Sequence, residues 1–210
     1  MNKPILRTVV FTLASLSFAA LLGEFYGLWT MRSFAIVTFI PAIVALIWLA
    51  KQDADARLWI VEGAIGGIVA AVVYDIFRLP FVMGGYPLFA VFPKFGQMLL
   101  DIPLTIPPNQ APLDSHVVGW IYHFVNGASL GIMFLAMCVR PTRKWLFGGA
   151  ILWALAVEIM LLLSPYYSFF KLHLDPNVFL VLTLSAHAVF GVVLGWWLSR
   201  RVSVATSSTR

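Results

Sequence analysis

The chain has 210 residues, of which 61% are hydrophobic and 11% are charged, whereas about a quarter of the residues in soluble domains are charged. Together with a mean hydropathy of +0.91, this composition excludes a secreted disulfide scaffold, a disordered regulator, a coiled coil and an ordinary cytosolic enzyme. The net charge of +5 keeps nucleic acid as a candidate partner until the basic residues are placed. The composition itself predicts an integral membrane protein.

Six apolar runs are long enough to cross the hydrocarbon core, which takes roughly 20 helical residues. They lie near residues 8–30, 33–50, 58–80, 117–139, 145–164 and 177–198. The first run contains Ser17-Phe18-Ala19, which imitates a signal-peptide cleavage site, but its apolar stretch continues to Trp29, too far for a typical signal peptide. We therefore expect an all-α membrane protein whose residues 1–210 form one transmembrane domain of six helices.

The basic residues orient these helices. If both termini lie in the cytoplasm, ten of the 14 lysines and arginines fall on the inner side and four on the outer side, as the positive-inside rule requires. These residues stand in short clusters at helix ends and no soluble domain carries them, so the sequence does not support a nucleic-acid partner. We expect the lipid bilayer as the partner, and a disordered tail over residues 203–210.

The single cysteine, Cys138, limits the redox and metal chemistry of the chain. It has no partner for an internal disulfide and no CxxC neighbour for a thiolate metal site. Any metal site in this sequence must therefore use histidines and carboxylates.

The connection over residues 81–115 is longer than a usual helix–helix link and is rich in proline. Residues 88–92 and 98–100 are apolar, so we expect the segment to lie in the interface or to dip over the bundle, broken by Pro93 and Pro103. It is either an interfacial elbow or a lid over a cavity that opens to the outside.

Two of the runs share the nine-residue pattern HxxxGxxLG, which begins at His123 in the fourth run and at His187 in the sixth. The spacing places the histidine and both glycines on one slowly turning helix face. The glycines allow a neighbouring backbone to approach, and the histidine follows the same seam into the interior. The pattern indicates either packing helices, each with one interhelical histidine hydrogen bond, or a duplicated site.

The preceding runs also resemble each other, because Gly66-Gly67 precedes Asp75 and Gly148-Gly149 precedes Glu158 at similar spacings. This predicts an internal repeat. Residues 58–139 and 145–198 would be two hairpins of the same orientation, related by a pseudo-symmetry axis near the membrane normal. Residues 1–50 would be an additional N-terminal helix pair that shields or clamps this core.

Four ionisable side chains are expected inside the membrane, where such groups are costly and mark functional sites. One acid and one histidine come from each hairpin, Asp75 with His123 and Glu158 with His187. Their distances from the helix ends place all four in the outer half of the bilayer. Asn126 lies one turn from His123 on nearly the same face.

This set of side chains admits three kinds of chemistry. Two imidazoles and two carboxylates suit zinc or iron, with Asp75, His123, Glu158 and His187 as ligands. The same groups suit a proton relay or a polar-ligand site, because a histidine that titrates near neutrality can pass protons inward to a buried carboxylate beside it. No HExxH motif sharpens the metal interpretation, and structural hydrogen bonding is the third possibility.

Asp75 and Arg78 are three residues apart on one helix face and can pair. In one interpretation they form a local ion pair at the membrane boundary, and Arg78 reaches the lipid headgroups. In the other, Arg78 sits at the entrance of the site and attracts an anionic group while Asp75 faces inward.

The glycine-rich third run, the histidine-bearing fourth run, the Gly-Gly fifth run and the last run resemble the YagU-like family of bacterial inner-membrane proteins over residues 60–201. The last run carries Ser185-Ala186-His187 before Trp196-Trp197 and Arg200-Arg201. Only His187 matches closely enough to carry over, and the first helix pair lies outside the match. The resemblance implies a multi-pass protein of the bacterial inner membrane and no established chemistry.

Three functions follow from these residues. The leading one is binding or transport of a proton-linked or metal-linked small ligand from the outer side. Because 210 residues make a small transporter, a homo-oligomer of two copies is expected to form the pathway. A second is a membrane-integrated, metal-dependent enzyme acting on a lipid-like substrate, although no serine or cysteine nucleophile sits beside the cluster. A third is a structural or assembly protein whose glycine faces dock helices.

Overall fold

The structure is a computed structural model that describes residues 2–139, 142–170 and 174–207. Within these residues the only regular secondary structure is helical, and six helices are long and apolar enough to cross a membrane. Five of the six are single elements: α1 (Lys3–Phe25), α4 (Ala54–Met83), α6 (Leu113–Met137), α7 (Arg143–Leu163) and α9 (Pro176–Ser207). The all-α, six-helix architecture expected from the sequence is thereby confirmed.

The remaining span, Met31–Gln52, is a bent helix made of α2 (Met31–Phe34), η1 (Ala35–Phe39) and α3 (Ile40–Gln52). Its middle part, η1, is a π-helical turn. Pro41, in the first turn of α3, has no N–H to donate to the preceding turn, and a π turn accommodates such a break in the ladder. The bend follows from this proline.

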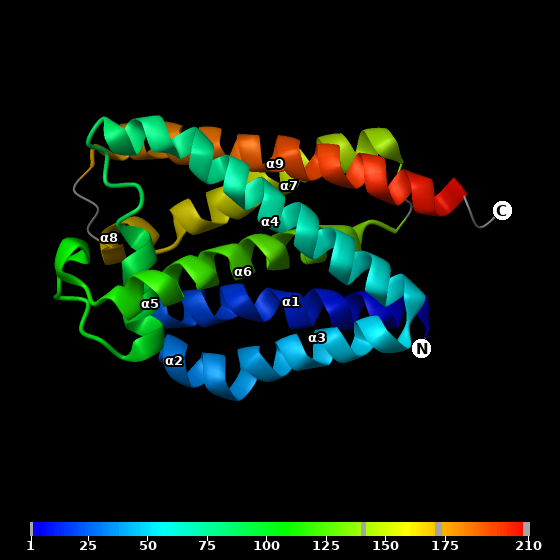
Figure 1. Ribbon diagram of the computed structural model, residues 1–210, viewed down its shortest axis with the longest axis horizontal. Helices are drawn as coiled ribbons and strands as arrows, with labels where there is room; N and C mark the ends of the chain where they lie inside the picture. Colours follow the sequence, from blue (N-terminus) through cyan, green and yellow to red (C-terminus); the bar gives the residue numbers. More distant parts are fainter. Residues whose placement is uncertain (1, 140–141, 171–173, 208–210) are drawn as a thin grey trace.

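The helices lie side by side as an elongated bundle, with both termini at one end (Figure 1). The short helices α5 (Val91–Leu100) and α8 (Tyr166–Phe170) lie at the opposite end, together with the 3-10 turn η2 (Pro108–Gln110). We call this opposite end the long-loop end, because the connections over residues 84–112 and 164–170 lie there. Any site near α5 and α8 therefore faces away from the termini.

Several helix bounds differ from the sequence expectation. Pro80 does not end its helix, because α4 continues to Met83, where Gly84 and Gly85 follow. A proline so near a C-terminus interrupts few hydrogen bonds. Pro93 does not break α5 either, since it lies in the first turn, where backbone N–H groups have no intrahelical partner.

Helix α9 extends to Ser207, and the disordered tail over residues 203–210 stays a prediction. No glycine or proline occurs between Trp196 and Ser207 to stop the helix. Residues 208–210 lie outside the described residues.

Glycine seams join the helices in pairs. A Cβ added to Gly131 of α6 would overlap the carbonyl oxygen of Gly63 on α4, so the two backbones touch. On α9, a Cβ at Gly191 would lie 2.6 Å from the Cα of Ile151, and one at Gly195 would lie 2.8 Å from the Cα of Phe147, both on α7. The HxxxGxxLG faces thus pack α6 on α4 and α9 on α7.

The Gly-Gly pairs behave differently in the two hairpins. A Cβ at Gly67 would overlap the carbonyl of Gly127, whereas one at its counterpart Gly149 would lie 3.4 Å from the Phe134 ring, an ordinary contact, and one at Gly148 would meet nothing within 4 Å. Small alanines, Ala150 and Ala154, take the close-packing role on α7. The hairpins share the histidine-bearing seam but not the Gly-Gly contact, and their relation by a pseudo-symmetry axis stays a prediction.

The N-terminal helix pair packs on the first hairpin, α1 against α6 and α3 against α4. At the terminal end, Nη1 of Arg7 on α1 donates to the carbonyls of Ala136, at 2.9 Å, and Cys138, at 2.7 Å, where α6 ends. Cations stabilise the C-terminal end of a helix in this way. The additional pair therefore packs on the first hairpin, and Arg7 ties α1 to the C-terminal end of α6.

Candidate functional site

The first His–carboxylate pair joins α6 to α4. His123 Nε2 lies 2.9 Å from Asp75 Oδ2, and Nη1 of Arg78 lies 3.7 Å from the other carboxylate oxygen, Oδ1. Asp75 and Arg78 are 8% and 5% exposed. Because the acid sits on the face of α4 that the glycine seam presses against α6, the pairing follows from the helix packing. Asp75 thereby orients the imidazole and holds the guanidinium nearby.

The second pair joins α9 to α7. His187 Nδ1 lies 3.1 Å from Glu158 Oε2 and 3.0 Å from the carbonyl oxygen of Thr183, one turn earlier on α9. A carbonyl oxygen only accepts hydrogen bonds, so Nδ1 carries a hydrogen. The nitrogen that gains or loses a proton is therefore Nε2, to which no described residue is hydrogen-bonded. Glu158 is only 3% exposed, so this pair is buried within the bundle.

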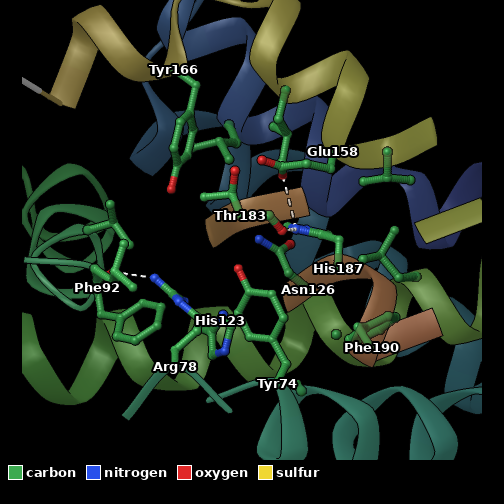
Figure 2. A pocket seen from close by; sticks show the side chains of 18 of the residues that line it. Tyr74, Arg78, Phe92, His123, Asn126, Glu158, Tyr166, Thr183, His187 and Phe190 are labelled. Atoms are coloured by element: carbon green, nitrogen blue, oxygen red, sulfur yellow. Dashed lines mark hydrogen bonds and ion pairs between the residues drawn. The ribbon is translucent and has the colours of Figure 1, made fainter. Parts of the chain in front are cut away.

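Both pairs open on one cavity of about 90 Å³ in the half of the bundle nearer the long-loop end. Figure 2 shows the labelled side chains gathered around it. Its polar lining comes from α4, α6, α7, α8 and α9: Tyr74, Arg78, His123, Asn126, Glu158, Tyr166, Thr183 and His187. Phenylalanines and aliphatic side chains complete the wall. Asp75 does not line the cavity and acts on it through His123 and Arg78.

Tyr74 stands between the two imidazoles. Its ring centroid is 6.0 Å from that of His123 and 5.1 Å from that of His187. The two histidines therefore lie no farther apart than these two distances combined, with a phenol ring between them. Tyr74 is not among the site residues predicted from the sequence, although its place next to Asp75 in a membrane helix is a usable signal.

Arg78 points into the bundle and does not reach the headgroups. One of its terminal nitrogens, Nη2, donates to the carbonyl of Leu88, in the segment just before α5. Its guanidinium carbon lies 4.8 Å from the ring centroid of Tyr74 and 5.6 Å from that of Phe92. Nε is buried and has no hydrogen-bond partner in the described part of the chain. Of the two interpretations of Arg78, this geometry favours an inward-facing charge.

Segments at the long-loop end cover the cavity. Val91, Phe92 and Phe95 of α5 line it, as does Tyr166 of α8. The Lys94 ammonium donates to the carbonyl of Phe170 at 2.7 Å, which ties α5 to α8. Burial raises the pKa of Tyr166 above its usual value, so this residue presents a neutral hydroxyl. The 81–115 connection is therefore more than an elbow, because part of it roofs the cavity.

Asn126 lines the cavity one turn from His123, as its spacing predicts. Its side-chain oxygen, Oδ1, is buried and accepts no hydrogen bond from any described residue. Buried polar atoms normally have a partner, so an orphaned acceptor marks a place where a donor from outside the chain fits.

The four predicted metal ligands meet as two pairs and not as one cluster. Among residues 2–139, 142–170 and 174–207, no group of three or more His, Cys, Asp or Glu side chains is placed to hold a metal ion. Zinc and iron sites need three or four such ligands around one point. Zinc or iron at Asp75, His123, Glu158 and His187 thus stays a prediction that the geometry does not favour.

Charge in the cavity is nearly balanced. With both imidazoles neutral, the carboxylates of Asp75 and Glu158 outnumber the Arg78 guanidinium by one charge. One proton on the histidine pair removes this excess, and a second makes the site positive. Buried charge favours the balanced state.

Comparison with protein-family models, with curated proteins and with solved structures finds no match for this chain.

Proposed function

We propose that this multi-pass membrane protein binds a small polar ligand together with protons and carries it across the bilayer. The observation that carries the proposal is that two His–carboxylate pairs and a buried arginine open on one cavity between the helices. Ionisable side chains in such a position mark substrate or proton pathways by default.

Protons are part of the proposal because histidine is the side chain that titrates near neutral pH. Each imidazole is held by a carboxylate through one nitrogen, and both histidines line the cavity. With two histidines around one cavity, the protonation of the site can change to offset the charge of the bound ligand.

Helix docking alone accounts less well for these residues. The glycine seams already bring α6 onto α4 and α9 onto α7, and apolar side chains could fill the space between them. A polar cavity with an orphaned amide oxygen on Asn126 and an orphaned Nε on Arg78 adds cost without adding packing. A bound ligand would supply hydrogen-bond partners for these two atoms.

The direction of access follows from the basic residues. The starts of α1, α4 and α7 and the ends of α3 and α9 lie at one end of the bundle (Figure 1), and the sequence carries basic residues there, among them Lys3, Arg7, Lys51 and Arg57. The positive-inside rule then puts this end in the cytoplasm and the roofed cavity on the outer side. The YagU-like resemblance adds a bacterial inner membrane, and the small size of the chain favours a homo-oligomer.

Proton flux into proteoliposomes tests this function. The full chain is reconstituted around the pH-sensitive dye pyranine, and a panel of small acids, amines, sugars and amino acids is added outside. We expect at least one solute to change the internal pH, and His187→Gln and His123→Gln to abolish the change. His116→Gln is the matched control, because this histidine is on α6 outside the cavity. No solute-dependent flux from folded protein would refute the proposal.

A further inference from the structure

Resting on this proton-linked function, we propose that the ligand is a small monocarboxylate held by the guanidinium of Arg78. Arg78 is 5% exposed and lines the cavity. Of its five N–H donors, one hydrogen-bonds to the Leu88 carbonyl, Nη1 lies 3.7 Å from Asp75, beyond hydrogen-bond distance, and Nε has no partner in the described part of the chain. A buried guanidinium with open donors needs an acceptor, and a carboxylate matches its fork.

The Leu88 carbonyl accepts a hydrogen bond from Arg78 and so occupies part of the position that the carboxylate of the ligand would take. A backbone carbonyl is a weaker partner for a guanidinium than a carboxylate, because it carries no charge. Leu88 lines the cavity and belongs to the segment that leads into α5, the helix that covers it. When a carboxylate replaces this carbonyl, the segment loses its tie to Arg78, so ligand binding and movement of the roof are coupled.

A cationic ligand fits less well. The aromatic faces nearest the charge, Tyr74, Phe89 and Phe92, already face the guanidinium of Arg78, with centroids 4.8, 5.3 and 5.6 Å from its central carbon. An ammonium group placed there would meet this positive charge. Beside Arg78, the favoured ligand therefore has an anionic head at the guanidinium and an uncharged body against the aromatic wall.

The size of the cavity limits the body of the ligand. A volume of about 90 Å³ accommodates roughly three to seven water molecules, depending on how tightly they pack. Carboxylates of about four to six non-hydrogen atoms fit this space, which includes acetate, propionate and lactate. Longer fatty acids do not fit without displacing the roof.

Binding of such an anion draws a proton into the site. The imidazoles of His123 and His187 face the titratable or charged groups Tyr74, Asp75 and Arg78 on α4, Glu158 on α7 and Tyr166 on α8. A monoanion adds one negative charge to a site that is balanced with one protonated imidazole. A proton from water, taken up by the second imidazole, restores the balance.

Isothermal titration calorimetry of the detergent-purified full chain tests the inference. Sodium propionate and propylammonium chloride are titrated in two buffers of different ionisation enthalpy, which gives the affinity and the number of protons exchanged. We expect propionate to bind with uptake of about one proton, and Arg78→Gln to weaken it about tenfold to hundredfold. Arg32→Gln is the control, because this arginine is half exposed and lies outside the cavity.

Each outcome decides the matter. Propionate affinity unchanged in Arg78→Gln, or reduced as much in Arg32→Gln, overturns the carboxylate site. Binding of propylammonium alone, with proton release, overturns the ligand class but leaves proton-linked binding intact. If neither probe binds but solute-dependent proton flux is still present in proteoliposomes, only the ligand class is overturned. If neither probe binds and no solute-dependent flux is found, the proposed function is refuted too. If Arg78→Gln does not fold, Arg78→Lys decides, because it keeps the charge and loses the fork, and wild-type affinity in it contradicts the proposal.

Discussion

The ring of Tyr74 meets the imidazole of His187 edge-on, with centroids 5.1 Å apart and ring planes at 75°. On its other side, 6.0 Å away, lies His123. No described residue is hydrogen-bonded to the Tyr74 hydroxyl, although the side chain lines the cavity. The phenol therefore separates the two His–carboxylate pairs and offers a hydroxyl to whatever occupies the space between them.

Removing this hydroxyl should affect ligand binding more than stability. Tyr74→Phe keeps the ring between the histidines, so we expect nearly unchanged thermal unfolding and reduced solute-dependent proton flux. Tyr122→Phe is the matched control, because the Tyr122 hydroxyl donates to the Ser17 carbonyl at 2.7 Å and holds α6 to α1. It should lose about 1 kcal/mol of stability with its flux retained. The reverse pattern would show that Tyr74 is structural.

The His187–Glu158 pair should be more costly to break than to replace. His187→Leu leaves the Glu158 carboxyl buried without its partner, which costs about 1–3 kcal/mol. The double variant His187→Leu, Glu158→Leu removes both polar groups, and such replacements are often neutral. We expect its unfolding midpoint in detergent to lie closer to wild type than that of the single variant, while proton flux is lost in both. A double variant less stable than the single one would contradict this account of the pair.

The glycine seam should tolerate no methyl group where backbones touch. Gly131→Ala would force α6 away from the Gly63 carbonyl of α4 and cost about 1–3 kcal/mol. Gly148→Ala, on the open side of α7, meets nothing within 4 Å and should be neutral or stabilising by up to about 1 kcal/mol. Thermal unfolding in detergent measures both. Equal effects at the two positions would mean that α4 and α6 are not in close contact.

The lone thiol should react slowly. Burial raises the pKa of Cys138 to about 11, although the nearby Arg7 charge acts in the opposite direction. At pH 8 roughly one thiol in a thousand is then a thiolate, the reactive form. We expect maleimide labelling of folded protein to accelerate with each pH unit up to pH 10, and to be fast at pH 8 only after denaturation in SDS. A labelling rate that levels off below pH 9 would place the thiol in a different environment.

Much of the fold and part of the site could be predicted from the sequence. Apolar length fixes six spans, and counting residues from the helix ends placed Asp75, His123, Glu158 and His187 at similar depths. The repeated HxxxGxxLG face assigned one acid and one histidine to each hairpin, because depth and face depend on helix geometry alone. It did not show that the four side chains meet as two pairs rather than around one point.

Features that depend on how helices cross were not predictable. Nothing in the sequence shows that Tyr74 stands between two imidazoles contributed by separate hairpins. The direction of Arg78 depends on the Leu88 carbonyl, which reaches it only after the 81–115 connection folds back. For the same reason the environment of Gly148 was not predictable: it holds the position in its Gly-Gly pair that Gly66 holds in the other, but no neighbouring helix of the described residues packs against it.

The central claim is that two His–carboxylate pairs exchange protons with one shared cavity. Nuclear magnetic resonance of the full chain labelled with nitrogen-15 at its histidines tests this directly, in detergent and across pH 5 to 9. We expect the His187 Nδ1 signal to stay that of a protonated nitrogen throughout, the Nε2 signal to titrate, and His123→Gln to shift the His187 titration. An Nδ1 signal that loses its proton, or a His187 titration that is the same with and without His123, would contradict the account.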